Sequence, residues 1–379
     1  MKPDFKSLTL AELSSLLKEG GHPPYRAGQV LQWAYERTVE SFEAMSNLPA
    51  PLRQWLTEKF DLWTVRELRE QHSTDTTEKF LWQLRDQQLV ETVLIPATPG
   101  LTSRADRHTV CVSTQVGCAY GCRFCASGLA GFRRNLTTGE IVDQILAITR
   151  IGRTAGIRVA SETRQPDPDF RINNIVVMGM GEPLANYNNL MKALRIFNAP
   201  WGIGIGARKI TVSTSGLAPQ IRRLADELMQ FHLAVSLHAP TDEVRTKIMP
   251  INRKYPLKEL IAACEYYSRV RGRMLTFEYI LIEDLNDSFE LAGKLAALAR
   301  QVHAKVNLIP YNTVEGLSWR RPPTNRCLAF AQQLKKHGIL ATLRVDKGTD
   351  IAAACGQLRL KTEKEQTGLT AKTQRREEQ

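Results

Sequence analysis

The sequence predicts an α/β protein in which a partial barrel of six β/α units, a (β/α)6 arrangement, follows a small N-terminal helical domain. Three observations lead to this prediction. From residue 109 onward, short β-branched runs alternate with amphipathic stretches, whereas the first 60 residues show only helical periodicity. Unusual polar residues and cysteines also follow the expected strands. Alternating strands and helices with long crossovers are typical of a parallel sheet.

The first 60 residues are expected to form the helical accessory domain. Apolar residues recur at three- and four-residue spacing in 8–17, 27–38 and 51–60, separated by GGHPP and SNLPAP. Residues 61–100 form a β-rich connector, in which FLWQL and LVETVLIP are short segments that could pair antiparallel.

Residues 101–358 are expected to form the barrel domain. Its predicted strands are 109–114, 172–178, 209–215, 233–238, 275–282, 305–310 and 341–345. Thr137 and Glu140 form the sequence pattern of a capping box at the start of the helix after the first strand. Residues 359–379 are polar and charged, so we expect a disordered tail.

Composition limits the class of protein. Apolar residues make up 43% and charged residues 24% of the chain, which is ordinary for a globular protein. No run approaches the roughly 20 apolar residues of a membrane span, and the N-terminus lacks the apolar segment of a signal peptide. We therefore expect a cytoplasmic protein without a membrane partner. The seven cysteines are an odd number, which argues against a framework of disulfides alone.

The chain has a net charge of +12, and residues 101–357 of the predicted barrel domain carry +13, so the excess is not on a tail. An excess of this kind on a folded domain suggests a polyanionic partner such as RNA, although a merely basic enzyme would show it too.

The residues that follow the strands should meet at one rim, because the carboxyl ends of parallel strands build the active site in such folds. Three cysteines follow the first strand, and GMGEPL (Gly179–Leu184) follows the second. TSG, HAP and the pair Tyr311 and Asn312 follow the third, fourth and sixth strands.

Cys118, Cys122 and Cys125 form the most specific local pattern in the chain. Thiolates at this spacing suit zinc or an iron–sulfur cluster. A structural zinc site needs a fourth ligand, which Cys111 or His108 could supply. A cubane cluster held by three cysteines instead leaves one iron open to a small molecule, and S-adenosylmethionine (SAM) can chelate such an iron.

Several further motifs, together with the cysteines, resemble the RlmN/Cfr family of radical SAM RNA adenine methyltransferases. The matching pieces are VETVLIP, CVSTQVGCAYGCRFCASGLAGFRRNLTTGEIVDQ, MGMGEPLANYNN, TVSTSG, SLHAP, IMPINRKYP, NLIPYN and DIAAACGQL. They occur in the family's order over about three quarters of the chain. The resemblance implies a partial (β/α)6 radical SAM barrel, and residues 1–60 are similar to the family's RNA-binding accessory domain.

The resemblance also implies the cofactors and their ligands. Cys118, Cys122 and Cys125 would bind a [4Fe-4S] cluster. The residues expected to contact SAM are Gly181, Glu182, Ser213, Ser236, Leu237, His238 and Asn312. A carboxylate such as Glu182 can bind the SAM ammonium group, and hydroxyl and amide groups can hold the ribose and the carboxylate.

Three further residues carry the chemistry that the resemblance implies. Cys355 would be methylated by one SAM, and a radical made from a second SAM would abstract hydrogen from that methyl group, so two SAM are used per turnover. Addition to adenine C2 would crosslink protein and RNA. Glu91 would then accept the C2 proton, and Cys111 would attack Cys355, leaving a disulfide. Without the resemblance, the two cysteines would be interpreted as packed core thiols and Glu91 as the exposed face of a strand.

The resemblance implies methylation of adenosine C2 in the peptidyl-transferase centre of 23S rRNA and in tRNA next to the anticodon. The alternative within the family is C8 methylation, which confers antibiotic resistance. A radical SAM enzyme acting on a small molecule and a non-catalytic zinc or RNA-binding module are more distant alternatives. We also expect an electron donor such as flavodoxin or ferredoxin, and a monomer.

Overall fold

The computed structural model describes residues 2–96, 107–129, 131–157, 164–312, 317–344, 351 and 356–365. The chain divides into two compact units. Unit 1 comprises Met1–Thr114, Asn135–Gly179 and Asn186–Ile210, and unit 2 comprises Gln115–Arg134, Met180–Ala185 and Thr211–Gln379. Cys355 lies outside the described residues, as do residues 366–379 of the predicted tail.

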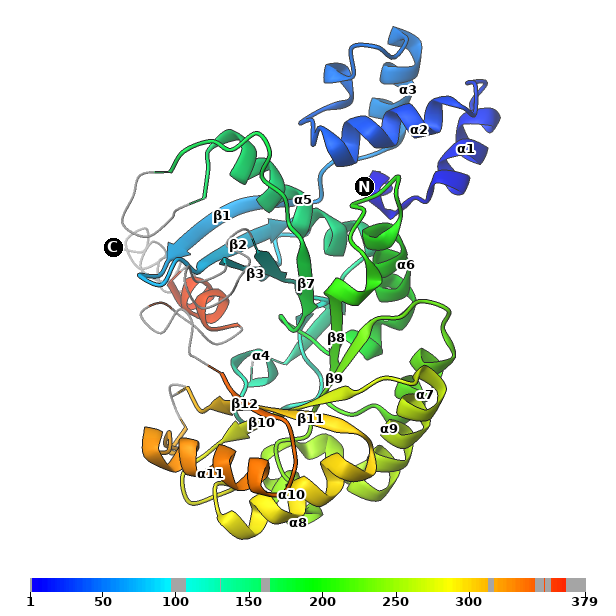
Figure 1. Ribbon diagram of the computed structural model, residues 1–379. Coiled ribbons are helices and arrows are strands. Elements are labelled where there is room, and N and C mark those ends of the chain that lie inside the picture. Colours follow the sequence, from blue (N-terminus) through cyan, green and yellow to red (C-terminus); the bar gives the residue numbers. More distant parts are fainter. Residues whose placement is uncertain are drawn as a thin grey trace, which may run out of the picture. The chain divides into compact units, whose positions relative to one another are not determined.

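The N-terminal helices of unit 1 confirm the helical prediction for the first 60 residues (Figure 1). They are α1 (Leu10–Glu19), α2 (Arg26–Leu31), which continues as a π-helical turn (Gln32–Glu36), and α3 (Ala50–Lys59). Short 3₁₀ turns lie at Phe5–Ser7 and Phe42–Ala44. Thr9 and Glu12 form a capping box that begins α1. The apolar faces of these helices are buried, as expected for amphipathic helices that pack together.

The sheet of unit 1 has the order β1-β2-β3-β4-β7. Its strands are β1 (Val65–His72), β2 (Glu78–Leu84), β3 (Leu89–Pro96), β4 (His108–Cys111) and β7 (Asn174–Val177). The pairs from β1 to β4 are antiparallel, and β4 pairs parallel with β7. Strands β2 and β3 confirm the predicted antiparallel connector. Strand β1 was not predicted from the sequence, because this edge strand is mostly exposed and shows no regular alternation.

Helices α5 (Thr138–Thr154) and α6 (Tyr187–Asn198) complete unit 1 with the 3₁₀ turns at Pro183–Asn186, which spans the unit boundary, and Ala207–Lys209. The predicted capping box of Thr137 and Glu140 is present, with both reciprocal hydrogen bonds formed. Gln144 of α5 accepts a hydrogen bond from the Thr92 hydroxyl (2.8 Å), which in turn accepts one from Trp82 Nε1 (2.8 Å). Helix α5 therefore covers the face of the β2–β3 sheet that carries Trp82 and Thr92.

The N-terminal segment is held to α5 by buried polar contacts inside unit 1. Lys6 Nζ lies 2.6 Å from Asp143 Oδ1, and both side chains are fully buried. The backbone N–H and the hydroxyl of Thr64 both donate to Asp143 Oδ2, each at 2.6 Å. Asp143 is therefore the shared acceptor that fastens the accessory helices to the sheet of unit 1.

Unit 2 contains a parallel sheet in the order β8-β9-β10-β11-β12. Its strands are β8 (Ile210–Thr214), β9 (His232–Ser236), β10 (Leu275–Leu281), β11 (Ala304–Pro310) and β12 (Ala341–Leu343). Its longer helices are α7 (Ala218–Asp226), α8 (Asp242–Ile248), α9 (Leu257–Arg271), α10 (Phe289–Gln301) and α11 (Thr324–Lys336). A 3₁₀ turn at Pro250–Arg253 follows α8.

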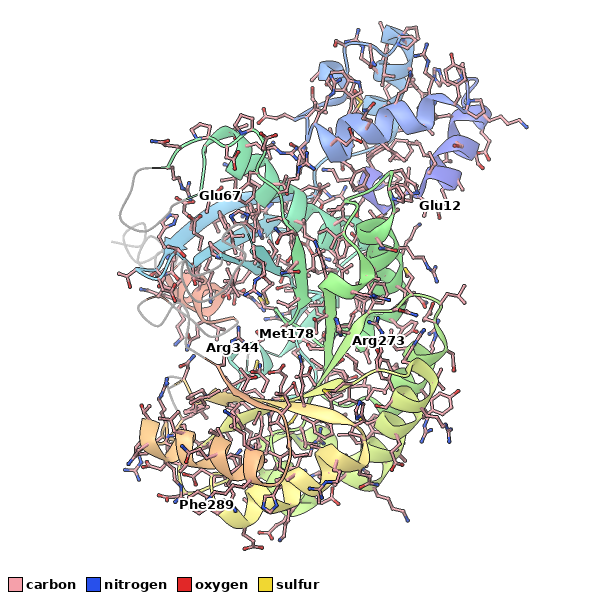
Figure 2. The ribbon with its side chains drawn as sticks, viewed as in Figure 1. Glu12, Glu67, Met178, Arg273, Phe289 and Arg344 are labelled. Atoms are coloured by element: carbon pink, nitrogen blue, oxygen red, sulfur yellow. The ribbon has the colours of Figure 1, made fainter. Side chains whose placement is uncertain are left out.

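The seven observed parallel strands, β4 and β7 in unit 1 and β8–β12 in unit 2, lie at the positions that the sequence predicted. Figure 2 labels two residues that directly follow such strands, Met178 after β7 and Arg344 after β12. In unit 2, the Tyr279 ring stacks on Phe330 of α11 at 5.5 Å, so this side of β10 faces the helices. Glu278, the neighbour of Tyr279, therefore points to the opposite face of the sheet.

One prediction about the chain's end is wrong in part. Residues 357–365 are helical rather than disordered, because Leu358, Arg359 and Thr362 lie on one helical face and are buried. The predicted division of the chain into segments 1–60, 61–100, 101–358 and 359–379 otherwise stays a prediction. Within the described part of the chain, no helix combines the length and apolar character that a membrane span requires.

Candidate active site

The three clustered cysteines lie in unit 2 on a loop between β5 (Gln115–Gly117) and α4 (Ala126–Leu129). Strand β5 pairs with β6 (Phe132–Asn135), a two-stranded ribbon that the sequence did not predict. Gly117 has φ of +74°, and a Cβ there would stand 1.8 Å from the carbonyl oxygen of Gly131. Only glycine fits this turn. It allows the Cys118 N–H to donate to Gly131 O at 3.1 Å.

The thiols of this loop are half-buried, and no disulfide joins any of the described cysteines. Burial, with smaller contributions from the nearby Glu182 and Cys125, raises the pKa of Cys118 to about 12. Burial and the neighbouring thiols also raise the pKa of Cys122 well above its usual value. A bound metal would displace these protons, because metal ligation requires thiolates.

The donor set fits an iron–sulfur cluster better than a structural zinc ion. Among the described residues, no three His, Cys, Asp or Glu side chains are arranged as a ready-made metal site. The assignment therefore rests on the spacing of Cys118, Cys122 and Cys125, on their shared half-buried loop and on the softness of three sulfur donors. His108 and Cys111, the suggested zinc ligands, lie on β4 in unit 1.

Glu182 is held in place by three backbone hydrogen bonds within unit 2. Its Oε2 accepts from the N–H of Ser215 (2.6 Å) and its Oε1 from the N–H of Leu184 (3.0 Å). Its own N–H donates to Gln115 Oε1 at 2.8 Å. Gly181 before it has φ of +99° and packs against Gln115, where a Cβ would come within 2.5 Å. The Glu182 carboxyl is therefore fixed by its surroundings rather than by its rotamer alone.

Burial is also the largest influence on the charge of Glu182. The side chain is 2% exposed, and burial raises its pKa, while hydrogen bonds from Ser215 and Leu184 act in the opposite direction. A cationic ligand would favour the ionised carboxylate at this position. Gln115 was not identified from the sequence, because glutamine in a short strand carries no motif.

The remaining predicted SAM contacts also lie in unit 2, at the carboxyl ends of parallel strands. Ser213 is near the end of β8, Ser236 ends β9, and Asn312 follows β11 by two residues; all three are half-buried. Leu237 is fully buried. Since these strands are parallel, their ends share one edge of the sheet, as the sequence predicted.

His238 is a buried neutral imidazole beside the cysteine loop. Its backbone has φ of +57°, and its Nδ1 accepts a hydrogen bond from the Ile280 N–H at 3.0 Å. The ring proton of the neutral form is therefore on Nε2. The ring packs edge-on against Phe124, between Cys122 and Cys125, with centroids 4.7 Å apart. Burial, with a smaller influence from Arg245, lowers the pKa of His238 to about 3.

Arg245 of α8 connects the strand ends that carry these residues. Its fully buried guanidinium donates to the carbonyl oxygens of Ser215 (2.7 Å) and Leu237 (3.1 Å) and to Asn252 Oδ1 (2.9 Å). Burial lowers its pKa to about 10, so the side chain remains charged at neutral pH. Nothing in the sequence distinguished Arg245 from an exposed helix arginine, since its burial depends on loops far away in the chain.

Glu91 and Cys111 lie in unit 1, on neighbouring strands of the antiparallel sheet. Cys111 pairs directly with Val93, and Glu91 is two residues from Val93 on the same face. Such diagonal neighbours lie about 7–8 Å apart, with their Cβ atoms somewhat closer. Glu91 is 3% and Cys111 7% exposed, so Glu91 is not on an exposed face of its strand. Cys355 lies outside the described residues, and the catalytic roles of all three stay predictions.

Comparisons with known proteins agree with this arrangement. The model of the radical SAM superfamily matches residues 112–295, and that of the ribosomal RNA large subunit methyltransferase N-terminal domain matches residues 4–62. The chain is 52% identical to the "Probable dual-specificity RNA methyltransferase RlmN 3" of Opitutus terrae, over 98% of each chain. It is 50% identical to the "Probable dual-specificity RNA methyltransferase RlmN" of Akkermansia muciniphila, over 98% of this chain and 99% of that relative.

A solved structure supports the fold. The crystal structure of a radical SAM methyltransferase from Sphaerobacter thermophilus matches with a TM-score of 0.85 and 46% identity, covering 94% of this chain and 98% of that one. The predicted fold class is therefore confirmed.

Proposed function

Because this chain belongs to the RlmN family of radical SAM RNA methyltransferases, we propose that it methylates C2 of adenosine in two kinds of RNA. The proposed targets are an adenosine in the peptidyl-transferase centre of 23S rRNA and the adenosine next to the anticodon of tRNA. As a radical SAM enzyme, the protein uses a [4Fe-4S] cluster and SAM. The "dual-specificity" names of its relatives support two RNA substrates.

The chemical problem explains why such cofactors are needed. Adenine C2 is an electron-poor sp² carbon, so it cannot attack the methyl group of SAM directly. When bound, the cluster and SAM would supply reductive cleavage to a carbon radical and a destination for the electron that the adduct gives up. We assign two SAM to each turnover, one as methyl donor and one as radical source.

In unit 2, the protein's own residues bind and orient these groups. Cys118, Cys122 and Cys125 would supply three thiolates to the cluster. Glu182, held by the Ser215 and Leu184 N–H groups, would accept the SAM ammonium group. The remaining polar contacts would come from Ser213, Ser236, His238 and Asn312, with Gly181 and Leu237 giving backbone and apolar contact. His238 would donate from Nε2, because its Nδ1 already accepts from Ile280.

In unit 1, Glu91 and Cys111 would complete the transfer. Cys355 is proposed to carry the methyl group and, after loss of one hydrogen atom, to add through that carbon to C2. The radical adduct would give up one electron, and Glu91 would take the C2 proton, so that the electron pair of the C–H bond restores the aromatic ring. The Cys111 thiolate would then attack the Cys355 sulfur, the S–C bond would break, and the released carbon would take up a proton to become the methyl group.

One observation carries this proposal furthest: Glu91 and Cys111 share a buried face of two paired strands. A base and a nucleophilic thiol are what release from a crosslink demands. The basic barrel domain suits an RNA partner. We propose that the protein acts as a monomer in the cytoplasm, where both RNAs occur, and takes electrons from a flavodoxin or ferredoxin.

Mass spectrometry of nucleosides tests the function directly. Digests of 23S rRNA and tRNA from cells with and without this protein are compared for methyladenosine. Loss of the C2-methylated nucleoside from both RNAs is expected when the gene is deleted. A methyl group at C8, or no change in either RNA, would contradict the proposal.

A further inference from the structure

Lys79 is a buried cation beside the proposed base, and the reaction as described gives it no role. It lies on β2, is 1% exposed, and its Nζ is 3.1 Å from Oε2 of Glu91, which is 3% exposed. Both charges are thus withdrawn from water at the same place. Burying an isolated ion in a protein costs on the order of several kcal/mol. Each of the two charges therefore offsets part of the cost of burying the other.

The strand register places this ion pair next to Cys111. Lys79 on β2 pairs with Val93 on β3, which pairs with Cys111 on β4. The three side chains therefore form one row across the sheet, and Glu91 is the next residue along the same face. The other face carries Trp82 and Thr92, which connect through hydrogen bonds to Gln144 of α5. Lys79, Glu91 and Cys111 thus point away from α5 as one group.

A purely structural explanation accounts poorly for a lysine at this position. Well-packed apolar residues stabilise a core as well as a buried ion pair does, or better. A carboxylate that must remove a proton has a different need. It has to be held at the right place and in the right direction for the proton that it removes. A buried ammonium group 3.1 Å away restrains where the carboxylate points.

We propose that Lys79 is a positioning residue that keeps the Glu91 carboxylate oriented to remove the C2 proton of the crosslinked adenine. This inference rests on the proposed function, since it assumes that Glu91 is the base. In the step, the radical adduct gives up one electron, the proton moves from C2 to the Glu91 carboxylate, and the C–H electron pair enters the ring. Lys79 keeps its own protons and stays hydrogen-bonded to the neutral carboxyl that results.

The test separates crosslink formation from crosslink resolution. Holoenzyme with reconstituted cluster is reacted anaerobically with a 23S rRNA fragment in a single turnover, and crosslinked protein is quantified on denaturing gels over time. In Lys79→Met, the crosslink should form at a rate within about twofold of the parent. Its resolution should slow at least about tenfold, since a positioned base contributes about 10²–10⁴-fold. Lys79→Arg, which keeps the charge, should recover most of the rate.

Two controls show whether Lys79 acts through Glu91. Lys6→Met removes another buried lysine of unit 1, paired with Asp143 at 2.6 Å, and should leave resolution unchanged. The double variant Lys79→Met/Glu91→Gln should resolve no more slowly than Glu91→Gln alone, because residues that act as a unit are not additive. Should the methionine variant fail to fold, Lys79→Gln gives the same comparison with an uncharged side chain of similar length.

The outcomes distinguish this inference from the proposed function. Resolution at the parental rate in Lys79→Met or Lys79→Gln, while Glu91→Gln is slow, would overturn the role of Lys79 alone. Parental resolution in Glu91→Gln, or no crosslink in any variant, would overturn the proposed function itself. Equal loss of formation and resolution in Lys79→Met and Lys79→Arg would show a structural role and would also overturn the inference.

Discussion

The cysteines of this chain show how surroundings decide the role of one residue type. Cys264 on α9 and Cys327 on α11 are 0% and 2% exposed, so they lie on the buried faces of their helices, as expected for small apolar groups. Cys111 is almost as buried, at 7%, but it shares a sheet face with Lys79 and Glu91. Burial by itself would class these three cysteines together, whereas their neighbours separate them.

Replacing Cys111 tests its role at the residue scale. Cys111→Ala should still form the protein–RNA crosslink but should not resolve it, because the attacking thiol is missing. RNA should therefore copurify with the variant, as measured by absorbance ratio and nuclease-sensitive gel mobility. Cys264→Ala is the matched control and should purify free of RNA. Recovery of Cys111→Ala without RNA after turnover would show that the role is wrongly assigned.

His238 makes a pH-dependent contribution to stability. Its pKa is lowered in the folded protein to about 3, below the usual value of 6.5, so the unfolded chain binds more protons between these values. The free energy of unfolding should therefore fall as pH drops below about 6.5, by about 1 kcal/mol at about pH 5.5. Urea unfolding at about pH 7.5 and pH 5.5 measures this loss. In His238→Gln, the free energy of unfolding should change by about 1 kcal/mol less between these two pH values. The same change in both proteins would contradict the lowered pKa of His238.

At the element scale, the cysteine loop depends on the backbone more than on its side chains. The Gly117 turn brings the start of the loop against Gly131, and the Arg123 N–H donates to Ile248 O at 2.9 Å, which fastens the loop to the end of α8. The three sulfurs are therefore presented by a loop that is anchored on two sides. Such anchoring reduces the conformational entropy lost when a cluster binds.

Gly117→Ala should disrupt this loop. The added Cβ would stand 1.8 Å from Gly131 O in a backbone conformation with φ of +74°, so the loop must shift. Iron and sulfide per chain after anaerobic reconstitution should fall to less than about half of the parental value. Gly121→Asn is a control on the same loop, since Gly121 has φ of +59° with nothing near its Cβ position and asparagine tolerates such angles. Parental iron content in Gly117→Ala would contradict this account.

At the scale of the whole molecule, each unit is joined from segments that are distant in sequence. In unit 1, Asp143 of α5 pairs with Lys6 near the N-terminus and accepts hydrogen bonds from Thr64, just before the first strand of the sheet. Burial lowers the pKa of Lys6 to about 8, which reflects the cost of placing its charge in the interior. The accessory helices are therefore tied to the sheet by an ion pair whose partners cannot be removed independently.

Replacing Lys6 alone should lower the free energy of unfolding more than neutralising both Lys6 and Asp143. Lys6→Met leaves Asp143 charged and buried, and it should lower the free energy of unfolding by about 3 kcal/mol. Lys6→Met/Asp143→Asn keeps an acceptor for Thr64 but removes the charge, and it should recover more than about half of that loss. Urea unfolding of both variants measures the difference. A double variant no more stable than Lys6→Met would contradict the ion-pair explanation.

The sequence alone determined the order of elements and the chemistry of the cofactor loop. Seven parallel strands, two strands of the connector and the helix cap of Thr137 and Glu140 were found from local patterns, because hydrophobic periodicity and capping depend on neighbouring residues. The three cysteines were found for the same reason, since all lie within eight residues of one loop. Strand β1 escaped because an exposed edge strand needs no apolar alternation.

Only the tertiary structure decided which ordinary side chains become part of the site. Gln115, Arg245 and Lys79 carry no motif, and each matters because strand register or a loop contact buries it against a residue far along the chain. The burial of Glu91 could not be predicted from the sequence either. Alternation along β3 indicates which face Glu91 lies on, but it does not indicate whether another part of the chain covers that face. Local sequence fixes a residue's chemical type, whereas its charge state and its orientation depend on neighbours that folding brings to it.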